Sequence, residues 1–187
     1  MSRVKLNLIA AVCENNMGIG LDGTLPWRLK NEMAYFTSMT SKVQDKSKQN
    51  AVIMGRVTWD SIPHKYKPLA NRINIVITKS PYAIQQKAPQ GVEVVISLDE
   101  AIKLIEIRTD IETTWVIGGS HIYKAAIEHP NCDKVYLTEI QKFYECDTFF
   151  PKLDLQVFQL DNDDDVVTDK QVEDGVEYYT RVYKKIK

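Results

Sequence analysis

Six short apolar runs constrain the fold of this chain more than any other feature of its 187 residues. They read KLNLIAAV, NAVIMG, INIVIT, VEVVIS, TTWVIGG and KVYLTEI. Several are nearly continuous in apolar residues rather than alternating, which is typical of strands buried on both faces of a mostly parallel sheet. A sheet of this kind needs helices on both of its faces, so the runs predict an α/β fold.

Helical patterns lie between some of these runs. SLDEAIKLIE carries a capping box at Ser97 and Glu100 and an apolar face that includes Leu104 and Ile105. SHIYKAAIEH, which follows a glycine pair, predicts a second helix, and VEYYTRVYKKI alternates like an antiparallel strand at the sheet edge. We expect a single domain over residues 1–187, with a mostly parallel central sheet, an antiparallel C-terminal edge and helices on both faces.

Composition argues against several classes of function. The net charge of −1 provides no general attraction to nucleic acid or to a membrane. The three cysteines, Cys13, Cys132 and Cys146, lack the spacing of metal ligands, so we expect reduced thiols in the cytoplasm and no metal. The N-terminal SRVKLNLIAAVC resembles a short signal peptide, but Asn7 interrupts it and a buried strand explains it better. The acidic DNDDDVVTDK lacks the turn glycine of a calcium loop, which favours a solvated loop.

Three strand ends carry groups that suit a phosphorylated ligand. Ligands of parallel sheets bind outside the carboxyl ends of the strands. VIMGRVTW places Arg56 at the start of a short helix, IVITKS places Lys79 after a second strand, and WVIGGSHIY places Gly118 and Gly119 after a third. The N-terminus of a helix and the bare backbone of glycine can bind phosphate groups. The two cations suggest that the ligand carries an additional phosphate. There is no GxGxxG, so the usual dinucleotide fingerprint is absent.

The stretch LPWRLKNEMAYF contains an unexpected carboxylate. Read as a helix, it places Leu29, Met33 and Phe36 on one apolar face, and Glu32 falls inside that face. Most glutamates lie on helix surfaces, but the phase of this one directs it to the interior.

Six blocks, in their order and spacing, resemble the dihydrofolate reductase family in its eukaryotic, single-function form. They are NNMGIGLDGTLPW, NEMAYF, VIMGRVTWDSIP, PLANRINIVITKS, WVIGGSHIY and CDTFFP. The resemblance implies an oxidoreductase that reduces 7,8-dihydrofolate to 5,6,7,8-tetrahydrofolate with NADPH, by hydride transfer to C6 and protonation at N5. It implies a role in one-carbon metabolism and thymidylate synthesis, sensitivity to antifolates, and a cytoplasmic monomer that needs neither nucleic acid nor a membrane.

The resemblance also assigns residues. Glu32 would bind the pterin with Thr138 bracing it, Trp27 would hold a water, and the loop from Asn15 to Leu25 would close over the nicotinamide, with its glycines Gly18, Gly20 and Gly23 allowing it to move. Leu25, Trp27, Glu32 and Thr138 form the catalytic set. The substrate-binding set comprises Ile9, Ala11, Glu32, Met33, Phe36, Ile62, Leu69, Arg72, Ile117, Tyr123 and Thr138, with Arg72 on the tail carboxylate. The cofactor-binding set comprises Ala11, Ile19, Gly20, Arg56, Val57, Thr58, Thr78, Lys79, Gly118, Gly119, Ser120, His121 and Ile122.

Further implications concern the backbone and the departures from the family pattern. Cis peptides are expected at Gly118-Gly119 and before Pro68. Met33 stands where vertebrate members usually carry phenylalanine, Ile96 replaces a basic residue near the adenosine phosphate, and Tyr66 occupies a normally small polar position. These departures bear on inhibitor selectivity and cofactor affinity.

Two other functions remain open at this point. One is a related NADPH-dependent reductase acting on another heterocycle, such as a pyrimidine intermediate, which need not combine Glu32 with Arg72. The other is a catalytically idle module that binds a pteridine or a nucleotide. Absorbance at 340 nm with dihydrofolate and NADPH separates both from a dihydrofolate reductase.

Overall fold

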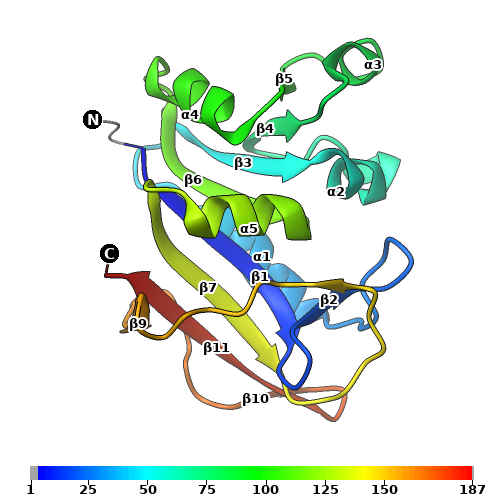
Figure 1. The fold of residues 1–187 in the computed structure, drawn as a ribbon, viewed down its shortest axis with the longest axis vertical. Coiled ribbons are helices and arrows are strands. Elements are labelled where there is room, and N and C mark those ends of the chain that lie inside the picture. Colours follow the sequence, from blue (N-terminus) through cyan, green and yellow to red (C-terminus); the bar gives the residue numbers. More distant parts are fainter. Residues whose placement is uncertain (1–3, 187) are drawn as a thin grey trace.

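The described chain, residues 4–186 of a computed structural model, is built around one large sheet (Figure 1). Its strands are β1 (Leu6–Cys13), β3 (Gln49–Gly55), β4 (Arg72–Ile77), β5 (Glu93–Val95), β6 (Ile111–Gly118), β7 (Cys132–Ile140), β9 (Phe158–Asp161), β10 (Gln171–Glu173) and β11 (Val176–Lys185). The strand order is β10-β11-β7-β1-β6-β3-β4-β5, and β9 also pairs with β11. A separate two-stranded sheet joins β2 (Gly18–Gly20) to β8 (Thr148–Phe149).

The parallel part of the sheet follows the six apolar runs. β1, β3, β4, β5, β6 and β7 all pair in parallel. β3 and β4 each contain five consecutive buried residues, as expected for strands covered on both faces. The α/β class and the mostly parallel sheet are therefore confirmed.

The C-terminal side of the sheet is antiparallel. β11 runs antiparallel to β7, and the short strands β9 and β10 pair with it antiparallel on its outer side. The predicted antiparallel edge is confirmed, but VEYYTRVYKKI is not itself the outermost strand. β9 and β10 have four and three residues, too few to produce a recognisable alternation in the sequence.

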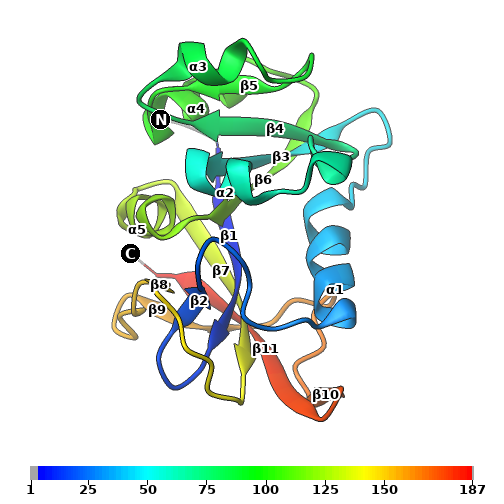
Figure 2. The same ribbon diagram turned by 90° about the vertical axis from the view of Figure 1, so that its right-hand side faces the viewer.

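Helices cover both faces of the sheet. They are α1 (Lys30–Ser41), α2 (Arg56–Ser61), α3 (Pro81–Gln85), α4 (Leu98–Glu106) and α5 (Ser120–Glu128), with a 3-10 turn η1 (His64–Tyr66). Figure 2 shows α1 and α5 on opposite sides of the strands. One core cluster joins the strands to α4 and α5, and a second lies against α1 and α2.

Helix α4 differs slightly from its prediction. Its buried side chains are Leu98, Ala101, Ile102 and Ile105, whereas Leu104 is only half-buried. The Ser97 hydroxyl accepts the Glu100 N–H at 3.0 Å, as a capping box requires, but the Glu100 carboxylate accepts from the Ile96 N–H.

Two absences hold within residues 4–186. No helix there is both long and apolar enough to cross a membrane. No three His, Cys, Asp or Glu side chains in that range are arranged as a metal site. Residues 2 and 3 of the stretch that resembles a signal peptide lie outside the described residues, and its remainder includes β1.

Candidate active site

Helix α1 carries Glu32 into the interior. The carboxylate side chain is only 7% exposed, which confirms the prediction from its phase. The interior face runs through Glu32, Phe36 and Thr40 at intervals of four residues. Met33, at 45% exposure, lies off this face, and Leu29 precedes the helix as its N-cap residue. The predicted face of Leu29, Met33 and Phe36 was therefore wrong in detail, because the buried stripe passes through Glu32 itself.

Burial dominates the electrostatics of Glu32. Desolvation raises the pKa of its carboxyl from 4.5 to about 7. The Thr138 side chain, which is 1% exposed on β7, hydrogen-bonds the carboxylate and lowers the pKa, whereas the charge of Glu173 raises it. Near neutral pH the group can therefore exist with or without its proton, a property expected of a site that handles protons.

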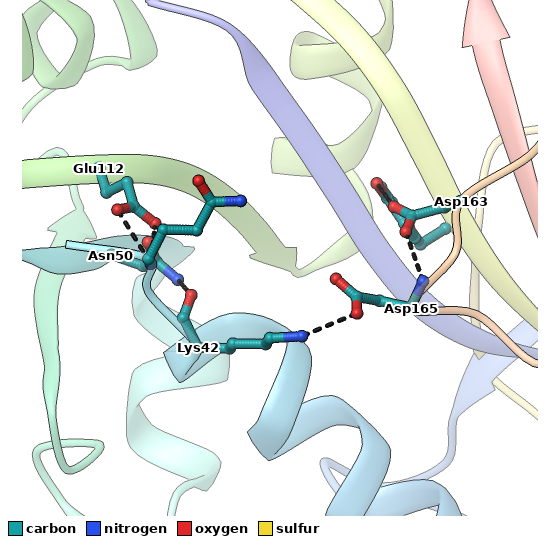
Figure 3. A network of polar contacts seen from close by, with 7 residues as sticks. Lys42, Asn50, Glu112, Asp163 and Asp165 are labelled. Carbon is teal, nitrogen blue, oxygen red and sulfur yellow. Dashed lines mark hydrogen bonds and ion pairs between the residues drawn. The ribbon is translucent and has the colours of Figure 1, made fainter. Parts of the chain in front are cut away.

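Distant polar side chains hold both ends of α1. At its N-terminus, the Glu173 carboxylate accepts the Asn31 N–H at 3.0 Å. At its C-terminus, the fully buried Asn50 side chain donates to the Thr40 and Lys42 carbonyls at 3.1 and 2.8 Å. Figure 3 shows this end, where Lys42 also pairs with Asp165 at 2.7 Å. The helix that carries Glu32 is thus fixed by residues from three other segments.

The turn before β4 holds Arg72. The side chain of Asn74, 2% exposed, accepts the Leu69 N–H at 2.9 Å and donates to the Leu69 and Arg72 carbonyls, each at 3.0 Å. The Arg72 guanidinium donates through Nε to the Ala70 carbonyl at 2.8 Å and through Nη1 to the Thr40 hydroxyl at 2.9 Å. Burial lowers its pKa. The structure therefore brings a fixed cation to the far end of α1 from Glu32.

The predicted cofactor residues share one edge of the sheet. In the register, Gly55 at the end of β3 lies beside Ile77 of β4, and Met54 lies beside Gly118 of β6. The groups that follow these strands, Arg56 on α2 and Lys79 after β4, therefore lie at the same carboxyl edge, where the β3 and β4 arrows point in Figure 1. Arg56 pairs with Asp60 at 2.7 Å within α2.

Gly118 and Gly119 provide bare backbone beside α2. A Cβ on Gly118 would lie 3.3 Å from the Thr58 hydroxyl and 3.3 Å from the Tyr123 ring, and its φ of +127° disfavours any side chain. The predicted cis peptides at Gly118-Gly119 and Lys67-Pro68 are both present. The Tyr123 hydroxyl donates to the Ile9 carbonyl at 2.7 Å, which places these strand ends next to β1.

The loop from Asn15 to Leu25 is tied to the segment around β8. The Asn16 amide donates to the Tyr144 carbonyl at 3.1 Å, and the Asp147 N–H donates to the Gly20 carbonyl at 2.9 Å. A Cβ on Gly18 would lie 2.3 Å from Cys146 Sγ. Gly18 is therefore required for close packing, and the mobility that was expected of it stays a prediction.

Comparison with known proteins identifies the architecture. The dihydrofolate reductase family profile matches residues 5–185. The chain is 62% identical over 186 residues to a dihydrofolate reductase of Heliothis virescens, each covered to 100%. It is 45% identical to that of Gallus gallus, with 96% of both chains covered. The Schistosoma mansoni dihydrofolate reductase superposes with a TM-score of 0.83 at 38% identity, covering 98% of this chain and 100% of the other.

The chain belongs to the dihydrofolate reductase family. A dihydrofolate reductase works with a nicotinamide cofactor, and the residues at the sheet edge suit one. Glycine backbone at Gly118 and Gly119 permits close approach, and cations at Arg56 and Lys79 suit phosphate groups.

Several of the predicted site residues lie near one another in this structure. Ala11 pairs with Thr138 in the β1–β7 register, next to the helix that bears Glu32. Ile62, Leu69 and Ile117 are partly buried against the core on the α1 face. Other predicted residues lie at the surface: Leu25 is 46% exposed, Val57 is 64% exposed, and His121 is exposed. Their side chains do not enter the interior.

Sequence reasoning missed the residues that position the site. Asn50 and Asn74 are asparagines inside the apolar runs NAVIMG and INIVIT. A buried amide needs hydrogen-bond partners, so an asparagine within such a run is a signal that could have found both. Glu173 left no comparable signal, because its partner lies 142 residues away.

Proposed function

We infer that this dihydrofolate reductase reduces 7,8-dihydrofolate to 5,6,7,8-tetrahydrofolate and that its hydride donor is NADPH. The observation that carries the proposal is Glu32, a carboxylate 7% exposed on a helix whose neighbouring Met33 and Phe36 are partly exposed apolar side chains. A flat heteroaromatic ring whose face lies on those side chains could offer its amino and ring N–H groups to the carboxylate. Such a pair is a charge-assisted, bidentate match.

Arg72 supports folate over another heterocycle. Its guanidinium is oriented by Ala70 and Thr40, and a planar fork of this kind matches a carboxylate. A pterin held at Glu32 and a tail carboxylate held at Arg72 would require one elongated substrate with an anionic end. A pyrimidine intermediate would use the first group and leave the second without a role.

The cofactor proposal rests on the carboxyl edge of the sheet. Bound there, NADPH would supply a hydride. The bare backbone of Gly118 and Gly119 would approach the pyrophosphate, and Arg56 and Lys79 would flank the 2′-phosphate that distinguishes NADPH from NADH. Ala11, Ile19 and Gly20 would cover the nicotinamide.

Proton supply to N5 would depend on Glu32 and Trp27. No other carboxylate is proposed near the pterin, so Glu32 would orient the ring and favour its protonated form. Within residues 4–186 the buried Trp27 indole N–H has no hydrogen-bond partner, which fits a donor that holds a water molecule near the pterin. Water would then deliver the proton while Glu32 holds the ring.

The assay is the decrease in absorbance at 340 nm when the purified protein receives dihydrofolate and NADPH. We expect turnover with NADPH and little with NADH. Turnover with NADH equal to that with NADPH would reject the cofactor proposal while leaving the reductase activity intact. Inhibition by antifolates that mimic the pterin would support the place given to Glu32.

Two further expectations belong to this proposal. We propose a monomer, as the family resemblance implies, and sedimentation can test it. Cys13, Cys132 and Cys146 are all free thiols, which suits a reducing compartment, so we propose the cytoplasm. Fluorescence microscopy of a tagged chain tests that placement.

A further inference from the structure

Two cysteines far apart in sequence meet beside the active-site loop. Cys13 ends β1 and is fully buried, whereas Cys146 lies half-buried in the segment that leads to β8. Both belong to one apolar cluster with Trp27 and Tyr144. Their side chains are close enough for Cys146 to raise the pKa of the Cys13 thiol. Cys132 lies in a different cluster, among the core residues packed against α4 and α5.

The cysteine pair is connected to the loop from Asn15 to Leu25. The Cys13 carbonyl accepts the Met17 N–H at 2.7 Å. On the other side, a Cβ on Gly18 would lie 2.3 Å from Cys146 Sγ and 2.6 Å from Cys146 Cβ, so the backbone of the loop rests directly on this side chain. A displacement of Cys146 toward the loop would therefore act directly on Gly18.

We propose that Cys13 and Cys146 form a thiol–disulfide exchange site, at which a low-molecular-weight disulfide such as oxidised glutathione oxidises the pair and thereby displaces the active-site loop. The site goes beyond the reductase activity, because neither sulfur takes part in the proposed reduction of dihydrofolate.

The exchange proceeds in two steps. The half-exposed Cys146, as thiolate, attacks one sulfur of oxidised glutathione, and one glutathione thiolate leaves. Cys13, as thiolate, then attacks Cys146 Sγ and displaces the second glutathione. The protein loses two electrons and two protons, and these are gained by the two glutathione thiols. Burial and the neighbouring Cys146 raise the pKa of Cys13 to about 11, so the second step is slow at neutral pH and faster at higher pH.

Bond formation must move Cys146 more than Cys13. A disulfide requires a sulfur separation of about 2.05 Å, well inside the van der Waals contact of two thiols. Cys13 is held by its register with Ile140 of β7, whereas Cys146 lies outside any strand. The movement would pass to Gly18 and, through Asp147, to Gly20. The consequence for NADPH rests on the proposed function, in which Ile19 and Gly20 cover the nicotinamide.

The test begins with the full-length reduced protein, incubated with oxidised glutathione at about pH 8. We expect an intact mass lower by two hydrogens and a peptide map that links Cys13 to Cys146. We expect kcat/KM for NADPH to fall roughly 10- to 100-fold, because displacement of about 1 Å can have that effect. Dithiothreitol should restore both the mass and the rate.

Three serine variants serve as controls. Cys146→Ser should keep its activity and lose the response, and Cys13→Ser should gain the mass of one glutathione without forming a crosslink. Cys132→Ser should respond like the unmodified protein. An unchanged mass, or a crosslink that includes Cys132, would overturn the site. A Cys13–Cys146 crosslink with unaltered NADPH kinetics would overturn its action on the loop, whereas failure of the reduced protein to use NADPH would reject the proposed function alone.

Discussion

Replacing Glu32 by glutamine should make the ligand-free protein more stable and the enzyme slower. Burial raises the pKa of the carboxyl from 4.5 to about 7. Since a tenfold change in an equilibrium corresponds to about 1.4 kcal/mol, the folded state disfavours the ionised carboxylate by about 3 kcal/mol. Glutamine has nearly the same shape and keeps an acceptor for Thr138, but it cannot ionise. The variant therefore removes this cost and retains the packing.

The direction of the pH dependence follows from the raised pKa. Between pH 4.5 and about 7 the unfolded chain releases the proton and the folded chain keeps it, so the wild-type protein loses stability as the pH rises through that range. The free energy of unfolding of Glu32→Gln, taken relative to wild type, should therefore be about 2–3 kcal/mol larger at about pH 8.5 than at about pH 5. The same substitution should lower kcat at pH 7 roughly 10²- to 10⁴-fold, which is the usual contribution of acid–base catalysis. Lower pH should recover part of that loss.

Urea unfolding of both ligand-free proteins at the two pH values measures the first effect. A pH–rate profile with deuterated NADPH measures the second. Glu128→Gln, on the exposed side of α5, is the matched control and should change neither quantity. If Glu32→Gln were no more stable than wild type at high pH, the carboxylate would not be desolvated as the structure has it. A variant with near-normal kcat at pH 7 would remove Glu32 from the mechanism, whatever its stability.

Three further substitutions test the remaining parts of the site. Arg72→Lys should raise KM for dihydrofolate roughly 10- to 100-fold and leave KM for NADPH unchanged, because a lysine cannot keep the Ala70 and Thr40 bonds and also bind a carboxylate. Steady-state kinetics with each substrate varied in turn measures both constants, and the reverse pattern would show that Arg72 does not bind the tail carboxylate. The double substitution Arg56→Ala/Lys79→Ala should reduce the preference for NADPH over NADH about 100-fold or more; a preserved ratio of kcat/KM values would exclude both residues from the 2′-phosphate. Gly118→Ala should lower Tm and weaken NADPH binding, since its Cβ would meet the Thr58 hydroxyl and the Tyr123 ring. Calorimetry measures the first effect and fluorescence titration the second. Gly91→Ala is the control for backbone strain alone, because Gly91 has a φ of +92° and open space around it.

The elements that could be predicted from sequence are those whose physical cause lies within one segment. A strand buried on both faces needs an apolar run, and a parallel sheet collects its chemistry at the carboxyl strand ends, so β3, β4 and β6 and the groups after them could be located. The interior direction of Glu32 followed from the helical period. The exact centre of the buried face of α1 could not be predicted in this way. It depends on how far Tyr35, Phe36 and Met39 pack against the sheet, which the sequence of α1 does not determine.

The supporting contacts could not be predicted, since each joins segments that are distant in sequence. Asn50 accepts the Thr113 N–H across 63 residues, and Glu173 binds Asn31 across 142 residues. Such hydrogen bonds have no fixed spacing, and the sequence shows only half of each. The close approach of Gly18 to Cys146 is hidden for the same reason.

These distant contacts act on the proposed substrate through the length of α1. Glu32 and Thr40 lie on one face, eight residues apart, which corresponds to about 12 Å at the rise of an α-helix. Thr40 accepts from Arg72 and donates to the Phe36 carbonyl at 2.8 Å, so the helix itself sets the separation between the buried carboxylate and the fixed cation. Glu173 at one end of the helix and Asn50 at the other keep that separation constant. Neither residue is proposed to touch dihydrofolate, yet loosening either end would let the pterin and the tail be bound only one at a time.

Glu173 also has a second effect, because the charge that favours the start of the helix raises the pKa of Glu32. The Glu173 carboxylate thus both supports the start of α1 and helps to keep the pKa of Glu32 near neutral pH.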